Sequence, residues 1–313
     1  MSAAKSIRAA GAEKFSKCSL PDVEDFFIPI QSLNDKYSAD NIIGTGYFSK
    51  ILLATDVDSS ADSSSVVIKC IPKRTSSPKS VSNEILVGTT CISRNIARTI
   101  VWSEDTNFYY IVIEYIKGQN FLEIIEGNKG FFWKEPVIAI EIIINILKGL
   151  FVLHSHNFIH RDLKLENIMV SLGDSVKIID FGFSVPVSQL KDEFSGTLNY
   201  IPPEAVSCFV RKNRSQKIDI WAIGVIIYLM LFGKFPYECA SRVQLIEFMR
   251  DLQSGLKKMR FLKKLPESSD ANIMILFEVM RQCFQINPEQ RPSSEELLTI
   301  LSSFIKNEDL FDK

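Results

Sequence analysis

Four polar side chains near the middle of the chain have the types and spacing needed for chemistry. Asp162, Lys164 and Asn167 lie in one short run, and Asp180 follows thirteen residues after Asn167. A carboxylate such as Asp162 can accept a proton, and Lys164 can neutralise a transferring anion. Asn167 and Asp180 offer hard oxygen ligands that suit Mg²⁺. The four side chains together indicate proton transfer beside an anionic group.

Two short apolar runs connect these residues and would position them. Ile168-Met169-Val170 and Val176-Lys177-Ile178-Ile179 read as β-strands, and Gly173-Asp174 between them is a turn signal. We expect a β-hairpin that holds the two carboxylates and the amide a short distance apart.

The run His160–Asn167 (HRDLKLEN) and the later Asp180-Phe181-Gly182 resemble the catalytic loop and metal-binding motif of protein kinases. They depart at one position, where Leu165 replaces the usual proline. An Asp and a Lys on a solvated turn would explain any one of these residues, but not all of them at this spacing. The resemblance extends over residues 37–306. It implies an α+β fold with two lobes, a small β-rich N-terminal lobe with one helix and a larger helical C-terminal lobe.

The resemblance divides the chain into four segments. They are an N-terminal extension (1–36), the N-terminal lobe (37–116), the C-terminal lobe (117–306) and a short C-terminal tail (307–313). The extension has no clear periodicity and contains an apolar patch, Phe26-Phe27-Ile28-Pro29-Ile30. This patch either packs on the catalytic domain or belongs to a regulatory docking segment.

The composition excludes several other classes of protein. The 313 residues are 46% apolar, and 36 basic residues nearly balance 37 acidic ones, so nucleic acid or an anionic membrane is not expected as a main partner. Six scattered cysteines without CxxC spacing fit reduced thiols better than disulfides or a zinc site. Residues 137–153 are interrupted by polar side chains and residues 220–233 are too few to span a bilayer, so both indicate core helices. We expect a monomer in the cytoplasm, with the nucleus as the alternative.

Two features indicate a phosphate-binding N-terminal lobe. Gly44 and Gly46 let the backbone turn tightly and bring N–H groups near phosphate oxygens, with Ser49 where the family has a third glycine. Lys69 lies inside an apolar strand and needs an anionic partner. By resemblance, Lys69 would bind the α- and β-phosphates of ATP and an acid on the next helix. Glu84 is the only acid between Lys69 and Glu104.

The resemblance also implies an adenine pocket. Ile51, Val67 and Met169 would sandwich the ring, Ile113 would line the back, and the backbone of Glu114 and Ile116 would bond adenine. The full set of expected ATP contacts is Ile43, Gly44, Thr45, Gly46, Tyr47, Phe48, Ser49, Lys50, Ile51, Val67, Lys69, Ile113, Glu114, Ile116 and Met169.

The resemblance gives each catalytic residue a role. Asp162 would orient the acceptor hydroxyl and take its proton, Lys164 would stabilise the transferring phosphoryl group, and Thr197 would brace both. Asn167 and Asp180 would bind Mg²⁺. Lys164 and the pair Gly196-Thr197 are typical of Ser/Thr kinases. The expected function is therefore transfer of the γ-phosphoryl group of ATP to Ser or Thr hydroxyls of protein substrates.

Further residues are expected to hold the C-terminal lobe and its activation segment in place. Arg291 would pair with Glu204, and Asp219 would stand at the start of the central helix. Glu193 stands where many kinases are phosphorylated and could pair with Arg161, so the unmodified protein would already be competent. The alternative is that Glu193 is a solvated loop residue.

Within the superfamily, residues 44–49 and 68–73 look most like the Ca²⁺/calmodulin-dependent protein kinase group. Only seven residues follow Lys306, so Ca²⁺ control would have to act through a regulatory protein in trans. Glu166 could attract a basic substrate residue, but Asn120 and Leu229 replace two acids common in basophilic kinases.

The rival hypothesis is a pseudokinase that acts as a nucleotide-binding scaffold. Ser49, Pro202 and Gly88 are its support. Gly88 stands four residues after Glu84, where kinases usually place a bulky apolar side chain, and a glycine there should loosen the helix by about 1 kcal/mol. The position of that helix would then need support from elsewhere. Against this rival, each residue with direct chemistry is present.

Overall fold

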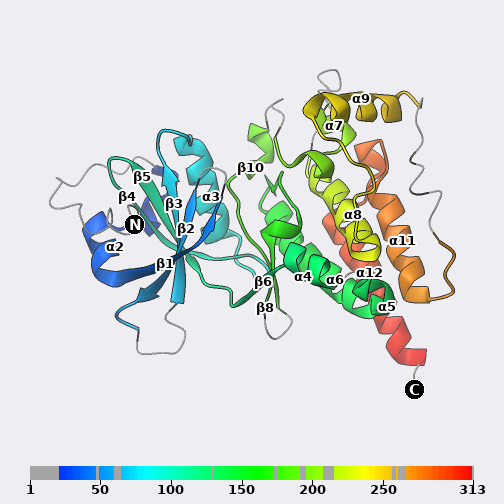
Figure 1. Ribbon diagram of the computed structural model, residues 1–313, viewed down its shortest axis with the longest axis horizontal. Helices are drawn as coiled ribbons and strands as arrows, with labels where there is room; N and C mark the ends of the chain where they lie inside the picture. Colours follow the sequence, from blue (N-terminus) through cyan, green and yellow to red (C-terminus); the bar gives the residue numbers. More distant parts are fainter. Residues whose placement is uncertain are drawn as a thin grey trace. The chain divides into compact units, whose positions relative to one another are not determined.

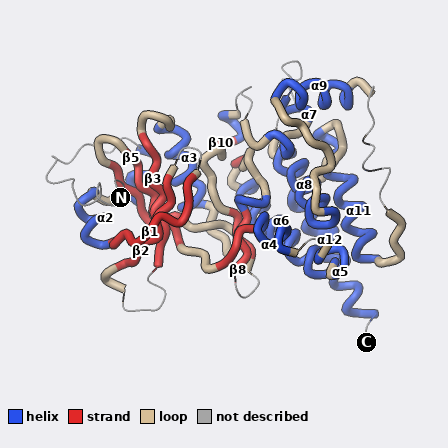
Figure 2. The backbone as a smooth tube through the Cα atoms, viewed as in Figure 1, coloured by secondary structure: helices blue, strands red, loops and turns tan. Residues whose placement is uncertain are grey.

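The computed structural model describes residues 21–46, 49–59, 65–128, 130–171, 175–190, 195–206, 215–255, 259, 262 and 266–311. The chain forms two compact units. Unit 1 is the chain up to Lys117 together with Asp180–Gly182, and unit 2 is Gly118–Ile179 together with the chain from Phe183. Strands dominate the first unit and helices the second (Figure 2). This is the two-lobed α+β architecture expected from the sequence.

Unit 1 is built on one antiparallel sheet of five strands in the order β1-β2-β3-β5-β4 (Figure 1). The strands are β1 (Tyr37–Thr45), β2 (Lys50–Asp56), β3 (Ser65–Pro72), β4 (Thr99–Glu104) and β5 (Phe108–Glu114). Lys69 on β3 pairs with Ile51 on β2 and Ile111 on β5. The register therefore places Lys69 in the middle of the sheet.

The two faces of the sheet are covered by different elements. Because successive side chains of a strand point to opposite faces, Val66, Ile68 and Cys70 share one face of β3. That face packs against helix α2 (Ile30–Lys36) through the fully buried Leu33. The other face, which carries Ile71, packs against helix α3 (Pro78–Thr90) and the 3-10 helix η1 (Pro21–Phe26).

Residues 21–36, the second part of the expected extension, pack on unit 1 through two buried side chains. Val23 is 2% exposed and Leu33 is 0% exposed, one on each side of the sheet. Phe27 and Ile28 of the apolar patch are partly buried against the two clusters, so the patch packs on the domain. The partners lie far away along the chain, and no local periodicity encodes their contact.

Helix α3 lies very close to strand β4 at Gly88. A Cβ atom at this position would lie 2.1 Å from Thr99 Oγ1 and 2.8 Å from Thr99 Cβ. No side chain fits there, so the glycine is a close-packing site between helix and strand. The expectation that Gly88 only loosens the helix is therefore incomplete, because the glycine also allows this contact.

Unit 2 is mainly helical. Its sheet joins β6 (Gly118–Asn120), β8 (Ile168–Ser171) and β9 (Val176–Ile178), and β7 (Phe158–Ile159) pairs with β10 (Val185–Pro186). The helices are α4 (Phe121–Gly127), α5 (Phe131–Lys134), α6 (Pro136–Ser155), α7 (Pro203–Val206), α8 (Lys217–Phe232), α9 (Arg242–Gln253), α11 (Ala271–Cys283) and α12 (Ser294–Phe311). Short 3-10 helices are η2 (Leu165–Asn167), η3 (Val187–Gln189), η4 (Leu198–Tyr200) and η5 (Pro288–Gln290).

The β8–β9 hairpin agrees with the sequence analysis, whereas the end of helix α12 differs from it. Strands β8 and β9 pair antiparallel as expected, while the turn residues Gly173-Asp174 lie outside the described residues. Helix α12 continues to Phe311 instead of ending near Lys306. The residues after Lys306 include neither glycine nor proline, so nothing in the sequence stops the helix there.

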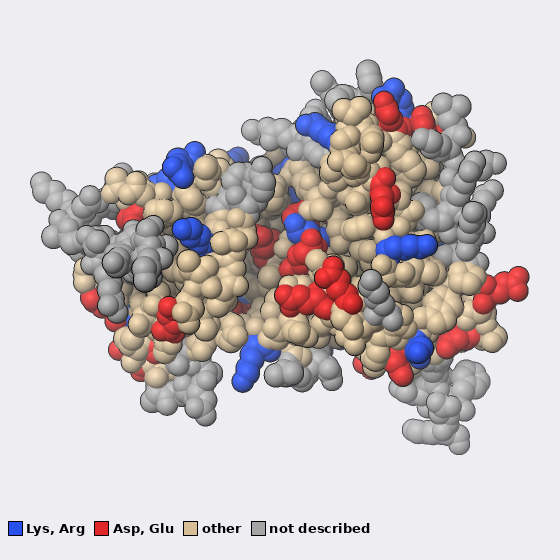
Figure 3. All heavy atoms as spheres, in the orientation of Figure 1, with Lys and Arg blue, Asp and Glu red and all other residues tan. Residues whose placement is uncertain are grey.

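Helix α8 is buried from Ile218 to Leu231 and packs against α11, while α6 packs against α12 (Figure 1). Helix α6 is long and apolar enough to cross a membrane by composition, but 61% of its most apolar stretch is buried inside the protein. This burial is what a core helix shows. On the face in Figure 3, basic and acidic side chains are interspersed, and acidic ones gather over α4, where Glu123 and Glu126 are exposed.

Candidate active site

Lys69 in unit 1 contacts two carboxylates. Its Nζ forms an ion pair with Glu84 Oε1 and lies 2.7 Å from Asp180 Oδ1. The side chains of Lys69 and Glu84 are 9% and 4% exposed. Burial alone would lower the pKa of Lys69, but the two carboxylates outweigh it and raise the pKa, so the lysine stays charged. The predicted partner Glu84 is therefore in contact with Lys69.

The backbone around Asp180 brings its carboxylate to Lys69. Asp180 has a left-handed conformation, with φ 60°, and its Oδ1 accepts a hydrogen bond from the Gly182 N–H at 3.3 Å. A Cβ on Gly182 would lie 3.3 Å from both Asp180 Oδ1 and Glu84 Oε2, which is tighter than most such contacts. Glycine at 182 thus lets this segment approach the ion pair closely.

The expected phosphate-binding turn lies between β1 and β2. The Gly46 N–H donates to the Ser49 carbonyl at 2.9 Å, and a Cβ on Gly46 would lie 2.8 Å from Ser49 Oγ. Ser49 therefore folds over Gly46 and fills space beside the turn. Tyr47 and Phe48 lie outside the described residues.

Three apolar residues of the expected adenine pocket share the sheet face of Lys69. Ile51 pairs with Lys69, and Val67, two residues before Lys69, pairs with Ile113. All three are partly exposed, so this face keeps apolar surface that a flat ring could cover.

The remaining expected ATP contacts lie on nearby elements or in unit 2. Ile43 and Thr45, at the end of β1, and Lys50, at the start of β2, are exposed. Gly44 lies between the first two on β1. The Glu114 N–H donates to the Arg98 carbonyl, and its Oε1 accepts from the Arg98 N–H at 2.8 Å. Ile116 is partly buried just after β5, whereas Met169 lies on β8 of unit 2.

Asp162 in unit 2 is the centre of a contact network formed by the expected catalytic residues. Its Oδ1 accepts a hydrogen bond from Thr197 Oγ1 at 2.8 Å, and its Oδ2 lies 3.0 Å from Lys164 Nζ. Lys164 Nζ also donates to Thr197 Oγ1 at 3.0 Å. Asp162 is 5% exposed. Thr197 thus fixes both the carboxylate and the ammonium group.

The donors expected to hold Mg²⁺ suit that ion. The amide nitrogen of Asn167 donates to the Asp162 carbonyl at 2.9 Å and to Asp162 Oδ2 at 3.3 Å, which leaves the amide oxygen as the ligand atom. Asp180 in unit 1 offers a carboxylate, and its side chain is 43% exposed. Oxygen donors of this kind are the ones that Mg²⁺ takes from proteins.

Asp219 holds the backbone of the catalytic loop. Its two oxygens accept hydrogen bonds from the N–H groups of His160, at 2.8 Å, and Arg161, at 2.9 Å. Burial opposes ionisation of Asp219, but the hydrogen bond and charge of His154 and the contacts with His160 hold its pKa below the ordinary value of 3.8. Arg161 has φ 69°, so a strained loop residue is stabilised here.

His154 and Ser294 take part in this network and were missed by the sequence analysis. His154 Nε2 lies 2.9 Å from Asp219 Oδ2, and its Nδ1 lies 3.1 Å from Ser294 Oγ. A histidine inside the apolar helix α6 was a signal, since a buried polar side chain needs partners. Gly196, with φ 101°, completes the region, because a Cβ there would lie 2.5 Å from the Arg161 carbonyl oxygen.

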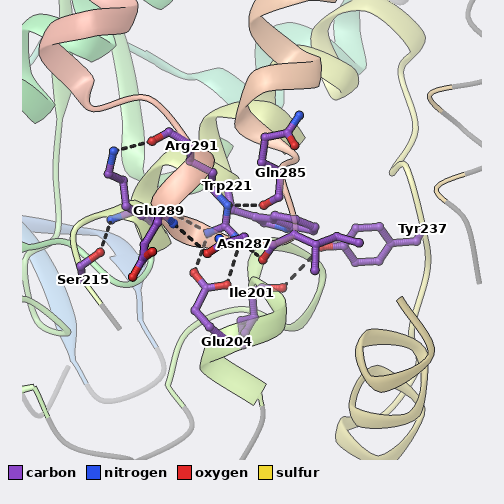
Figure 4. A network of polar contacts seen from close by, with 11 residues as sticks. Ile201, Glu204, Ser215, Trp221, Tyr237, Gln285, Asn287, Glu289 and Arg291 are labelled. Atoms are coloured by element: carbon purple, nitrogen blue, oxygen red, sulfur yellow. Dashed lines mark hydrogen bonds and ion pairs between the residues drawn. The ribbon is translucent and has the colours of Figure 1, made fainter. Parts of the chain in front are cut away.

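The expected pair Glu204–Arg291 is present and fully buried (Figure 4). Arg291 Nη1 and Nη2 bind Glu204 Oε1 and Oε2 at 2.5 and 2.7 Å. Arg291 also donates to the Gln285 carbonyl at 2.7 Å and lies over the ring of Trp221. The bidentate geometry ties α7 to the segment between η5 and α12.

The structure thus brings the expected residues together in separate groups. Lys69, Glu84 and Asp180 meet in unit 1, whereas Asp162, Lys164, Asn167 and Thr197 meet in unit 2. Glu193 lies outside the described residues, so its pairing with Arg161 stays a prediction.

Comparison with known proteins identifies similar sequences over most of the chain. Residues 37–301 match the model of the protein kinase domain. A probable serine/threonine-protein kinase KIN1 homolog of Enterocytozoon bieneusi is 28% identical over 262 residues, which cover 83% of this chain and 42% of the relative. Calcium-dependent protein kinase 4 of Plasmodium berghei is 30% identical over 68% of this chain and 40% of the relative. Serine/threonine-protein kinase PLK1 of Xenopus laevis is 28% identical over 84% and 42%. The chain spans about two fifths of the length of these relatives.

Proposed function

The chain belongs to the protein kinase family, and from this we propose that it transfers the γ-phosphoryl group of ATP to Ser and Thr hydroxyls of proteins. The observation that carries the proposal is the contact of Asp162 with both Lys164 and Thr197. It places a proton acceptor, a cation and a bracing hydroxyl together, and Lys164 with Thr197 is the Ser/Thr pattern. The names of the relatives support the same class.

Each residue has a defined part in the proposed reaction. Asp162, oriented by Thr197, accepts the proton of the substrate hydroxyl. The oxygen of that hydroxyl bonds to the γ-phosphorus, and the bond between the γ-phosphorus and the β-phosphate oxygen breaks. Lys164 stabilises the charge of the transferring group, and Lys69, held by Glu84, binds the α- and β-phosphates. Asn167 and Asp180 would hold Mg²⁺, which neutralises phosphate charge when bound.

We propose that activity does not require phosphorylation of the activation segment. The support is the position of Glu193, where a fixed carboxylate could pair with Arg161. If so, phosphatase-treated protein should turn over, and Glu193→Ala should lose most of that turnover while Glu193→Asp keeps part of it. Unchanged activity of Glu193→Ala would show that Glu193 is an ordinary loop residue.

The proposed substrates are proteins without a strict requirement for arginine. Asn120, which replaces one acid of basophilic kinases, caps helix α4 by accepting the Glu123 N–H at 3.0 Å. Leu229, which replaces the other, is 5% exposed in the core helix α8. Of these three positions, Glu166 is the one that carries an acid able to attract a basic residue. We also propose membership of the Ca²⁺/calmodulin-dependent group, on the likeness of residues 44–49 and 68–73.

The test is phosphotransfer from Mg-ATP to a generic Ser/Thr protein substrate, with Asp162→Asn as the blank. A typical kinase turns over at roughly 1–100 per second. Turnover above the blank is the expected result. Turnover equal to the blank, together with a thermal shift on adding nucleotide, would favour the scaffold alternative. The support for that alternative is the side chain of Ser49, which packs over Gly46 where the family has a third glycine.

A further inference from the structure

Trp102 of strand β4 connects the sheet of unit 1 to residues 21–28, here named the N-terminal strap. The indole Nε1–H donates to the Val23 carbonyl at 2.7 Å, and the Ile28 N–H donates to the Trp102 carbonyl at 2.9 Å. The ring of Phe27 lies edge-on to the indole, with centroids 4.9 Å apart. Trp102 itself is fully buried. The strap is thus fixed to β4 by two hydrogen bonds and a ring contact.

The strap also lies against helix α3. Val23, 2% exposed, belongs to the buried cluster that contains Val81 and Ile85 of α3 together with Trp102. Ile85 is the residue after Glu84, which binds Lys69. One side chain of the strap is therefore packed between β4 and the part of α3 that carries the ion pair.

Helix α3 depends on such packing because its strong helix signals are confined to its start, where the Ser77 side chain accepts the Ser80 N–H and Pro78 lies in the first turn. Lys79 lies in the first turn, no basic residue lies in the last turn of this fully described helix, and Gly88 interrupts its second half. The Lys79 charge opposes the helix dipole, and glycine lowers helix propensity. An isolated helix of this length is marginal in water. Glu84 adds a cost, because burial raises its pKa and disfavours its charged form.

We propose that the strap holds α3 in the position where Glu84 pairs with Lys69, so that Val23 and Trp102 are positioning residues for phosphotransfer. The inference rests on the proposed kinase function. It means that the support which α3 needs is supplied within the chain, by a segment that precedes the region matched by the family model.

The chain offers a matched control for this proposal. Leu33 of α2 is also a buried apolar residue near the N-terminus, but it packs on the opposite face of the sheet, in a cluster without α3 residues. Leu33→Ala removes more apolar volume than Val23→Ala and should destabilise the protein at least as much. A loss of activity caused only by destabilisation would therefore be larger in the control.

The first experiment compares full-length Val23→Ala, Leu33→Ala and wild type below the unfolding transition of each. Val23→Ala should lower kcat by roughly 3- to 30-fold, the range expected for a coupled position. Leu33→Ala should keep kcat within about twofold of wild type. Hydrogen exchange should become faster in α3 of Val23→Ala and stay unchanged in β2 and β3. Equal kcat values for Val23→Ala and wild type, or an equal loss in Leu33→Ala, would overturn the proposal.

A second experiment tests whether Val23 acts through the ion pair. In a Glu84→Gln background the pair is already broken, so Val23→Ala should cause no further loss of kcat. If the fold-loss of kcat in the double variant equals the product of the fold-losses in the two single variants, the proposal is contradicted.

The hydrogen-exchange result separates this inference from the proposed function. Wild-type turnover equal to that of Asp162→Asn would refute the kinase proposal, and exchange in α3 would still test whether the strap holds the helix, because exchange does not depend on turnover. Unchanged α3 exchange in Val23→Ala would refute the role of the strap alone.

Discussion

Thr197 shows how much one hydroxyl can organise at the scale of a residue. It donates to Asp162 and accepts from Lys164, so its single oxygen orients the proposed proton acceptor and the proposed phosphoryl-binding cation together. A hydrogen bond to a charged group contributes more than one between neutral groups. Both contacts lie within unit 2 and depend on the turn at Gly196, where only glycine fits.

Thr197→Val keeps the shape of the side chain and removes both hydrogen bonds. We expect kcat to fall roughly 10- to 100-fold, because a lost hydrogen bond to a charged group costs about 1.5–3 kcal/mol. Steady-state phosphotransfer measures this, with Thr197→Ser as the control that keeps the hydroxyl. If the valine and serine variants had the same kcat, the hydroxyl would have no part in positioning Asp162.

At the scale of elements, Gly88 links a helix to a strand. In an exposed helix, Gly→Ala would stabilise by about 1 kcal/mol. Here the new Cβ would meet Thr99, so we expect Gly88→Ala to lower the free energy of unfolding by about 1–3 kcal/mol through overpacking. Urea unfolding measures this change.

The partner Thr99 provides the control for Gly88. Thr99→Ala removes the atom that the new Cβ would meet first, so it should restore part of the stability in the double variant. A Gly88→Ala protein more stable than wild type would mean that α3 and β4 separate easily.

Elements also show what the sequence could and could not predict. The partner of Lys69 was predictable because a buried charge needs an opposite one and Glu84 is the only acid between Lys69 and Glu104. The pair of Glu204 and Arg291 was expected from the resemblance. Strands β8 and β9 were predictable from β-branched runs. The role of Gly88 was not, because it depends on Thr99, and the burial of Val23 was not, because it depends on Trp102. Both are tertiary contacts without a local pattern.

At the scale of the whole chain, the family match and the folded unit begin at different residues. The match starts at residue 37, whereas the core of unit 1 includes Val23 and Leu33. We expect the free energy of unfolding of a chain that begins at residue 37 to be lower by at least roughly 4 kcal/mol, because each of the two buried apolar side chains removed costs about 2–5 kcal/mol. Thermal unfolding measures the loss.

The control for the shortened chain begins at residue 21 and keeps both buried side chains. It should melt like the 313-residue chain and bind a hydrophobic dye no more strongly. Equal melting of the chains that begin at 21 and at 37 would show that Val23 and Leu33 contribute little to unit 1.

The strap also changes what an outside ligand would face at the surface of α3 and β4 that the strap covers. Because Leu33 anchors the chain just after the strap, the strap acts as a tethered ligand with an effective concentration of roughly millimolar. A free peptide of equal affinity would need a similar concentration to displace half of it. An inhibitor search against this surface should therefore use protein without the strap, and compounds found that way would have to outcompete the strap itself.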